Sequence, residues 1–400
     1  MDILYLSVLS SNRILKDLYH RSGCDPGFAI QKFNRLMAKG LQDNNIDVTI
    51  LSALPVRRQL SSKIFWNVKS EKEDGLTYRY LPFLNLPVIR QLCLYSAAFI
   101  KVLIWLFLNS REKVVICDVL NTSICMAALH ACSLLRKPVV GFVTDMPGLM
   151  VGQESVPSLR NKVTTLIRKS YLSSFDKYIF LTEAANHVVN KHCKPFVIME
   201  GISDSHMVDL TRKKRHRKKR TIMYAGGVFA KYGVETLVKA VTHLNPETCE
   251  LVIYGSGSFV DELKQYCNTY SHIRYMGVAL TSEVIQAELE ADLLVNPRPT
   301  DEVFTKYSFP SKNIEYMASG TPLLTTKLPG MPTDYYPYVF LIENESVEGY
   351  THALRQVLQQ SDEALYDFGE KARCYVLENK SGKKQGERVR NLLKQGKSKI

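Results

Sequence analysis

Strand-like segments alternate with helix-like segments along the whole chain, and this alternation constrains the fold more than any other feature. In the first half, the expected strands are 2–10, 47–51, 76–81, 114–117, 137–144, 177–182 and 195–199. In the second half, the pattern restarts, with expected strands at 221–225, 249–254, 273–276, 292–296 and 339–342. Strands that alternate with helices form parallel sheets with right-handed crossovers. We therefore expect an α/β fold built from two doubly wound domains.

Length and charge pattern predict where the domains divide. A chain of 400 residues is too long for one typical core, so two domains are the natural expectation. A run without apolar residues, 212–220, marks a solvated segment near the middle. We expect a first domain at 1–200, a basic linker at 201–220, a second domain at 221–365 and C-terminal helices at 366–400.

The net charge is +13, but the run 211–220 alone supplies eight Lys and Arg residues. A nucleic-acid-binding surface normally spreads its basic residues or interleaves them with aromatic ones, so we expect no nucleic-acid partner. The nine cysteines are odd in number and form no CxxC pair. We therefore expect reduced thiols in a cytoplasmic protein, and no metal site.

Residues 91–108 form a strongly apolar stretch with Lys101 as its only charge. The stretch approaches the length of about 20 apolar residues that a membrane span needs. Because it falls between two expected strands, we favour a buried or membrane-surface helix over a span. Together with basic segments at 160–169 and 211–220, it suggests peripheral docking on anionic lipid at the inner face of the cell membrane. A solvated linker is the alternative interpretation of the basic run.

Glycines follow three strands of the second half, at the strand ends where parallel sheets bind ligands. Gly226 and Gly227 follow the first of these strands, Gly255 and Gly257 the second, and Gly277 the third. Glycine lets the backbone approach a ligand closely, although a plain tight turn is the more common explanation of any one of these positions. Their recurrence at equivalent positions favours a nucleotide-diphosphate site.

Lys231 lies just before the helix that follows the first glycine pair, where its ammonium could meet a phosphate. The chain has no GxxxxGK[ST] loop, its first strand is not followed by GxGxxG, and it contains no Asp-x-Asp. These absences count against a P-loop nucleotide site, a dinucleotide site and a metal–diphosphate clamp. Cationic side chains and helix dipoles are left to neutralise a leaving diphosphate without a metal or other cofactor.

The stretch 304–326, FTKYSFPSKNIEYMASGTPLLTT, predicts a short helix that ends at a Gly-Thr-Pro stop and leads into an apolar strand. We expect Ser308 or Ser311 to cap the helix. Its N-terminus, with Ser311 and Lys312 beside it, suits a phosphate. Glu315 lies about one turn further, where a carboxylate could accept hydrogen bonds from sugar hydroxyls. A capped surface helix without a ligand is the alternative.

The second half resembles the retaining nucleotide-sugar glycosyltransferases of family 4, in particular those of capsular and surface polysaccharides. The resemblance is carried by YAGGV at 224–228, KYGVETLV at 231–238, VIYGSGS at 252–258, MGVA at 276–279, NPRPT at 296–300 and FPSKNIEYMASGTP at 309–322. It implies the GT-B fold, in which two Rossmann-like domains face a central cleft. The N-terminal domain would bind the acceptor and the C-terminal domain the NDP-sugar, with the C-terminal helices packing back toward the N-terminal domain.

In that family, the motif on this helix has two acidic residues separated by seven others. Glu315 matches the second, which binds the donor ribose, whereas the first falls on Tyr307, which is not acidic. Lys306, Tyr307, Ser308 or Glu302 are the candidates to replace the missing carboxylate contact to the transferred sugar. We expect donor specificity to depend on this departure from the motif.

The resemblance also assigns the diphosphate contacts. Lys231 matches the family's diphosphate-binding lysine, while the usual arginine partner falls near Gly227 and is missing. Arg298 and Lys312 are the candidates to replace it. The full set of expected donor-binding residues is Gly226, Gly227, Lys231, Gly255, Gly257, Gly277, Arg298, Tyr307, Phe309, Ser311, Lys312 and Glu315.

Asp145 ends an apolar strand of the first half and resembles the family's polar residue near the anomeric carbon. It could stabilise a developing oxocarbenium ion or orient the acceptor hydroxyl, although an Asp that starts a turn before Pro147 is the alternative. With Lys231 and Glu315 it completes the expected catalytic set.

The sequence therefore predicts transfer of a sugar from an NDP-sugar to a glycan or lipid-linked acceptor, with retention of configuration. A non-catalytic sugar-nucleotide-binding relative and a GT-B nucleotide-sugar epimerase are the alternatives.

Overall fold

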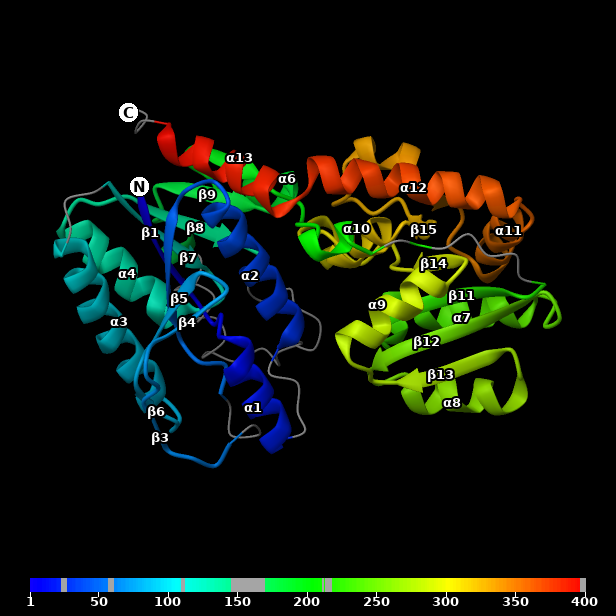
Figure 1. The fold of residues 1–400 in the computed structure, drawn as a ribbon, viewed down its shortest axis with the longest axis horizontal. Helices are drawn as coiled ribbons and strands as arrows, with labels where there is room; N and C mark the ends of the chain where they lie inside the picture. Colours follow the sequence, from blue (N-terminus) through cyan, green and yellow to red (C-terminus); the bar gives the residue numbers. More distant parts are fainter. Residues whose placement is uncertain are drawn as a thin grey trace. The chain divides into compact units, whose positions relative to one another are not determined.

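The computed structural model describes residues 1–22, 27–56, 61–108, 112–144, 170–210, 212 and 218–395. The chain divides into two compact units (Figure 1). The first unit comprises Met1–Ile202 and Gly382–Ile400, and the second comprises Ser203–Ser381. Each unit is a mixed α/β domain built on a largely parallel sheet, so the predicted fold class is confirmed.

The sheet of the first unit has the strand order β10-β9-β8-β7-β1-β2-β5-β4. All neighbours are parallel except β4 and β5, which pair antiparallel at one edge. The strands are β1 Asp2–Ser7, β2 Asp47–Ser52, β4 Glu71–Glu73, β5 Leu76–Tyr80, β7 Lys113–Asp118, β8 Val139–Val143, β9 Lys177–Phe180 and β10 Phe196–Ile198. The central strands β7 and β8 are buried along their whole length, as expected of a sheet covered on both faces.

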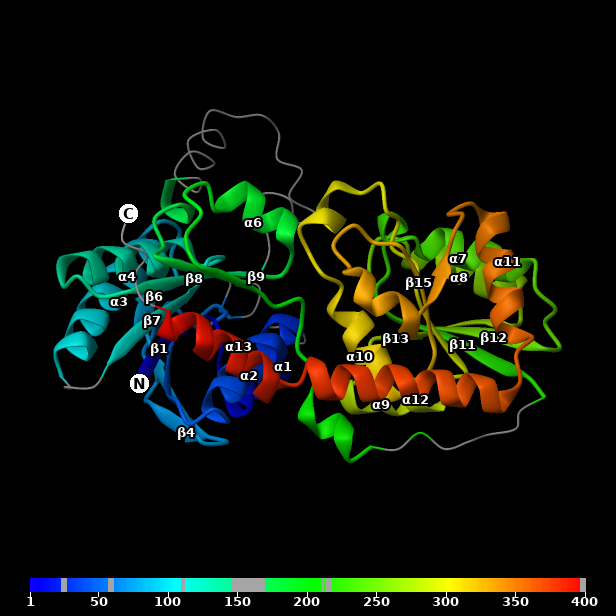
Figure 2. The same ribbon diagram turned by 90° about the horizontal axis from the view of Figure 1, so that it is seen from above.

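The helices of this unit are α1 Asn12–Ser22, α2 Phe28–Gln42, α3 Ile89–Phe107, α4 Thr122–Leu134, α6 Glu183–Val189 and α13 Gly382–Lys394. A two-stranded sheet, β3 Phe65–Trp66 with β6 Phe83–Leu84, precedes α3. Helices α3 and α4 pack side by side (Figures 1 and 2). Within the described residues, α3 is the one helix that is long and apolar enough to cross a membrane by length and composition. Of its most apolar stretch of 18 residues, 22% is buried.

Helix α13 belongs to the first unit although it lies at the far end of the sequence. It packs against α2 at glycines, because a Cβ on Gly40 would lie 2.1 Å from the carbonyl oxygen of Gly382. The Nζ of Lys177 donates to the carbonyl oxygens of Leu392 and Leu393, 2.9 Å each, and so stabilises the C-terminal end of α13. The last helix is therefore fixed by close backbone packing and by a buried lysine.

The second unit has a six-stranded, fully parallel sheet in the order β13-β12-β11-β14-β15-β16. Its strands are β11 Arg220–Gly227, β12 Cys249–Ser256, β13 Ile273–Gly277, β14 Leu293–Asn296, β15 Leu323–Thr326 and β16 Phe340–Ile342. Its helices are α7 Val234–Thr242, α8 Val260–Thr269, α9 Thr281–Glu290, α10 Ser311–Ser319, α11 Val347–Leu358 and α12 Asp362–Asn379.

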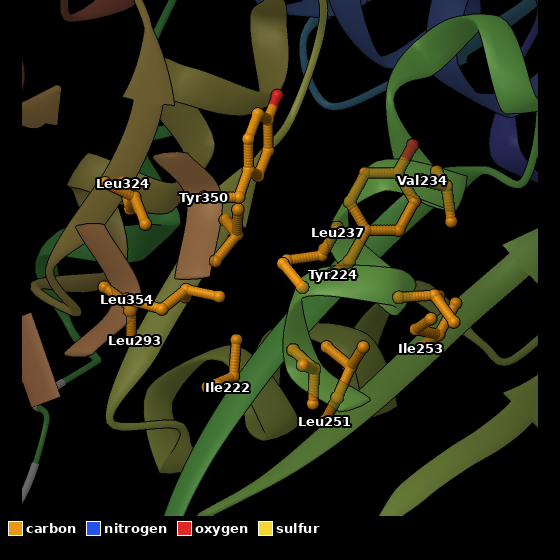
Figure 3. Close-up of a cluster of buried hydrophobic side chains, with 14 of the residues drawn as sticks. Ile222, Tyr224, Val234, Leu237, Leu251, Ile253, Leu293, Leu324, Tyr350 and Leu354 are labelled. Carbon is orange, nitrogen blue, oxygen red and sulfur yellow. The ribbon is translucent and has the colours of Figure 1, made fainter. Parts of the chain in front are cut away.

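Figure 3 shows part of the apolar core between this sheet and its helices. Ile222 and Leu251 from the central strands meet Leu237 of α7 and Leu354 of α11, and all four are fully buried. Burying such aliphatic side chains contributes roughly 1.5–3 kcal/mol each. This rigid core places the carboxyl ends of the strands, and the loops that follow them, at one edge of the sheet.

Candidate functional site

The glycines that follow the strands of the second unit are aligned across three neighbouring strands. Gly226 at the end of β11 pairs in register with Gly255 of β12, and Tyr254 of β12 pairs with Gly277 of β13. All of these strands are parallel, so their carboxyl ends lie at the same edge. The sheet thus brings together three loops that the sequence separates by 20 or more residues.

Two of these glycines are required by the packing of the loops themselves. A Cβ on Gly255, where φ is +130°, would lie 1.8 Å from the carbonyl oxygen of Gly226, and one on Gly257 would lie 2.1 Å from that of Val228. At Gly277 the φ of +74° favours glycine, but a Cβ would meet nothing within 4 Å. The tight-turn interpretation therefore explains Gly255 and Gly257, whereas Gly277 borders open space.

Lys231 lies in the short helix η2, Ala230–Tyr232, between β11 and α7. Gly233, with a φ of +77°, lies against the loop after β14, where a Cβ would be 1.7 Å from the carbonyl oxygen of Pro297. Because this close approach fixes the end of η2, Lys231 and Tyr232 are held beside the residues that follow β14. The Tyr350 hydroxyl donates to the same Pro297 oxygen, 2.8 Å away, and holds that loop from its other side.

Arg298 packs against two aromatic rings. Its guanidinium carbon lies 4.8 Å from the ring centroid of Tyr232 and 5.7 Å from that of Phe304. These cation–π contacts fix the side chain without neutralising its charge. Within the described part of the chain, neither Arg298 nor the half-buried Lys231 has a carboxylate within 4.0 Å. The sheet edge therefore holds two neighbouring cations that have no carboxylate counter-ion among the residues the structure describes.

Helix α10 begins differently from the sequence-based expectation. Its N-cap is Pro310, which provides no capping side chain, and Ser311 is the first helical residue. The Ser308 hydroxyl donates instead to the Phe304 carbonyl oxygen, 3.1 Å away, so the prediction of a serine cap was wrong. Among the described residues, the backbone N–H groups of Ser311 and Lys312 have no hydrogen-bond acceptor. The helix therefore presents free N–H groups at its positive end.

The position of α10 is fixed by buried polar contacts. Asn296, at the end of β14, donates from Nδ2 to Oδ1 of Asn313, 2.6 Å away. The Tyr316 hydroxyl accepts from the Ala225 N–H at 2.8 Å and donates to the Ala225 carbonyl oxygen at 3.0 Å. Burial raises the pKa of Tyr316 well above its ordinary value, so the hydroxyl keeps the proton it donates. These bonds tie the helix to the ends of β14 and β11.

Lys312 is already paired within the protein. Its Nζ lies 2.8 Å from a carboxylate oxygen of Glu315 and 3.7 Å from one of Glu288 on α9, whose side chain is fully buried. Burial lowers the pKa of Lys312, but Glu315 and Glu288 raise it, and the net direction is upward. Lys312 is thus a counter-ion for two carboxylates. Of the two candidates for the missing arginine, only Arg298 lacks a carboxylate partner in the described chain.

Glu288 is a residue of this region that sequence reasoning missed. It lies 24 residues before Lys312 in AELEAD, a polar pattern that is typical of an exposed helix end. In the structure its side chain is 0% exposed and faces Lys312. Glu288 and Glu315 both contact the Lys312 ammonium, so the orientation of Glu315 is part of a network that includes these three residues.

Phe309, Tyr307 and Glu302, which were also expected near the donor, differ in how their side chains are surrounded. Phe309 is buried and packs on Tyr335, with ring centroids 5.2 Å apart, so its side chain belongs to the core. Tyr307 ends the short helix η3, Val303–Lys306, and is half-buried. Its hydroxyl has no hydrogen-bond partner among the residues described. Glu302 lies at the start of the same η3.

Asp145 and the basic segment 160–169 lie outside the described residues. Within the residues that were described, no group of three or more His, Cys, Asp or Glu side chains is arranged to hold a metal ion.

A known protein-family model matches most of the second unit. Residues 219–360 match the family model described as "Glycosyl transferases group 1". No curated protein matched the sequence. The matched segment spans β11 to α11 and so contains every element of the glycine and cation cluster described above.

Solved structures resemble the whole chain at low sequence identity. A glycosyltransferase from Rickettsia africae has a TM-score of 0.65 and 14% identity, with 99% of each chain covered. HepE from Anabaena, solved in complex with UDP, has a TM-score of 0.63 and 12% identity, covering 98% of this chain and 99% of its own. A TarM variant from S. aureus, solved with UDP, has a TM-score of 0.63 and 13% identity, covering 99% of this chain and 100% of its own. At these identities the likeness establishes the GT-B fold.

The matched domain and the shared fold together support a glycosyltransferase with the GT-B fold.

Proposed function

We propose that the protein is a retaining glycosyltransferase of family 4 that transfers a sugar, in the hexosyl class, from an NDP-sugar to a glycan or lipid-linked acceptor. The observation that carries this proposal is the pair of cations, Lys231 and Arg298, that have no carboxylate partner in the described chain. A nucleoside diphosphate supplies the negative charge that they lack. Of the structures compared above, HepE and the TarM variant were solved with UDP, which is consistent with this ligand class.

The chemistry follows from where charge develops during transfer. As the sugar leaves, negative charge grows on the diphosphate and positive charge on the sugar ring. Lys231, Arg298 and the free N–H groups at the start of α10 would stabilise the diphosphate. Gly233 fixes the backbone next to Lys231, the aromatic rings hold the Arg298 side chain, and buried hydrogen bonds hold α10. Such preorganisation is what makes electrostatic stabilisation effective.

Glu315 would accept hydrogen bonds from the donor ribose. Its carboxylate is oriented by Lys312 at 2.8 Å, and Lys312 is in turn held by the buried Glu288. Tyr307, in place of an acidic residue, would contact the transferred sugar through its hydroxyl. Asp145, in the first unit, would act near the anomeric carbon or on the acceptor hydroxyl.

The proposed reaction is metal-independent, because side-chain cations take the place of a metal at the diphosphate. We place it in surface polysaccharide biosynthesis, in the cytoplasm, on the basis of the sequence resemblance.

A panel of labelled NDP-sugars tests the proposal. The full chain is incubated with each donor and with candidate acceptors, and transfer and donor binding are measured separately, binding by thermal shift. One donor should both stabilise the protein and yield a product whose anomeric configuration matches the donor. A product of inverted configuration would overturn the retaining mechanism.

Tyr307 motivates a second candidate, a non-catalytic sugar-nucleotide-binding relative. Its hydroxyl stands where the family has a carboxylate, so the contact to the transferred sugar is chemically different. Donor binding without transfer to any acceptor, and without hydrolysis or epimerisation, would favour this candidate over an enzyme.

A further inference from the structure

Helix α3 presents an apolar face to solvent. Its exposed large side chains are Ile89, Leu92, Ile100, Ile104 and Phe107, and their exposed fractions range from 43% to 70%. At 100° per residue these positions fall within one stripe along the helix, with Ser96 as the only exposed polar residue in it. A contiguous apolar surface that is exposed to solvent is typical of a site that binds another protein, a ligand or a membrane.

The opposite face of α3 is packed against its own domain. Leu94, Ala98, Val102, Trp105 and Leu106 are buried there. The Nζ of Lys101 donates to the Tyr80 carbonyl oxygen at 2.8 Å, and Lys113 donates to that of Leu106 at 3.0 Å. Because these contacts hold the helix against the sheet, its free face is available only to a partner that approaches from outside. The sequence-based expectation was a buried or membrane-surface helix in preference to a span, and the structure shows one face of α3 packed on its own domain.

The charge around this face is basic. Residues 75–111 and 119–144, which include α3 and α4, contain no Asp or Glu. Exposed basic side chains lie at both ends, with Lys63 on the Trp66 ring beside β6 and with Arg136 and Lys137 after α4. Glu112 is exposed and lies just before β7, and it is the first acidic residue after α3 in the sequence.

The basic character extends to the whole first unit. Within its bounds, the sequence has 32 Lys and Arg against 16 Asp and Glu, whereas the second unit has 20 against 23. The first unit thus carries a net charge of +16 and the second a net charge of −3. The run 211–220 belongs to the second unit, so it does not account for the charge of the first.

We propose that the exposed stripe of α3 docks the first unit on the surface of a bilayer that contains anionic phospholipid. The apolar side chains would enter the boundary between headgroups and acyl chains, with the helix lying in the plane of the membrane. The basic residues at its ends would contact phosphate groups. Charge complementarity selects lipid over a second copy of this face, since two copies would bring like charges together. The proposal is independent of the donor site, because vesicle binding needs no NDP-sugar.

Vesicle co-sedimentation of the full chain tests this docking. Wild-type protein should bind vesicles of phosphatidylcholine mixed with phosphatidylglycerol more tightly than vesicles of phosphatidylcholine alone, and added salt should weaken the binding. Ile100→Glu with Ile104→Glu should lower the partition coefficient by about tenfold or more. Arg136→Gln with Lys137→Gln should lower it about fivefold per charge on anionic vesicles.

Matched controls separate docking from general loss of charge or fold. Val188→Glu with Val208→Glu places two charges at apolar residues that are 41% and 57% exposed elsewhere, and binding should stay within about twofold of wild type. Wild type already contains Trp66 and Trp105, so quenching by brominated lipid is compared with that of wild type: Phe107→Trp should add quenching, whereas Phe196→Trp on β10 should not.

Three results would overturn the proposal. The first is wild-type protein that binds neither kind of vesicle. The second is an Ile100→Glu with Ile104→Glu variant that binds as tightly as wild type does. The third is a wild-type dimer in lipid-free solution that this variant disrupts. The last result would assign the stripe to a second copy of the chain.

Discussion

Two sets of cations in the second unit are built in opposite ways. Lys231 and Arg298 have no carboxylate within 4.0 Å in the described chain, and Arg298 is held by aromatic rings instead. Lys312 lies between Glu315 and the buried Glu288. A cation with an internal counter-ion has its charge largely neutralised, whereas a fixed cation without one attracts an anion from solution. We therefore propose that Lys231 and Arg298 bind the ligand, whereas Lys312 positions Glu315.

Replacing Lys231 should have the largest effect on transfer. Lys231→Ala should lower kcat/KM by about 10²–10³, because it removes a preorganised donor from the leaving diphosphate. Thermal unfolding should be nearly unchanged, since this lysine makes no hydrogen bond or ion pair in the described chain. Steady-state kinetics with the donor found in the panel provides the measurement. Wild-type turnover in this variant would contradict the proposed role of Lys231 at the leaving diphosphate.

Arg298→Ala should lower kcat/KM by about tenfold to a hundredfold, with a loss of about 1 kcal/mol in stability from its cation–π contacts. Arg298→Lys should restore part of the activity, because it keeps the charge but loses the planar contact to the rings. If the alanine variant loses stability but no activity, Arg298 serves only the packing of Tyr232 and Phe304.

Lys312→Met should act mainly on stability. It removes the ammonium that lies beside Glu315 and the buried Glu288, at a cost of about 2 kcal/mol after allowing for the 33% exposure of the lysine side chain. Adding Glu288→Gln should recover part of this loss, since it also removes the buried negative charge that faced Lys312. Denaturant unfolding of the single and double variants measures the coupling. Additive losses would show that the two side chains do not interact.

The ion pairs of Lys312 with Glu315 and Glu288 also predict that the free energy of unfolding depends on pH. The folded pKa of Lys312 is raised, so its stabilising effect is fully present below the pKa of the unfolded lysine, about 10.4, and is lost as pH rises through the higher folded value. The difference in unfolding free energy between wild type and Lys312→Met should therefore shrink at alkaline pH. A difference that stays constant through that range would contradict the ion pair.

Metal removal should have the smallest effect. If fixed cations alone neutralise the diphosphate, treatment with EDTA should change kcat/KM by less than about twofold. Activity that is lost on chelation and restored by a divalent cation would show that Lys231 and Arg298 share the diphosphate with a metal.

Local sequence patterns predicted much of the fold. The two series of alternating strands and helices gave the α/β class, because side-chain periodicity and strand-terminating glycines depend on nearby residues alone. Every strand expected in the second half is present, with bounds shifted by a few residues at most. The helix of 304–326 was also located, since Gly320 at its C-terminus takes a φ of +76° that favours glycine.

The errors and omissions concern contacts between distant residues. The choice of Pro310 over a serine as the N-cap depends on how the preceding loop packs, with Phe309 buried on Tyr335. The buried Glu288 faces a lysine that is 24 residues away in the sequence, a contact that local pattern does not reveal. Gly255 and Gly277 look alike in the sequence, yet one is required by a neighbouring strand end and the other borders open space.

The sequence by itself determined the fold class, the positions of the strand ends and the identity of the charged residues near them. Only the tertiary structure decided which of those charges are neutralised, because a counter-ion is defined by distance in space and not along the chain. It likewise decided which face of α3 is exposed: a helix that is apolar on all sides has no preferred face until its neighbours pack against one.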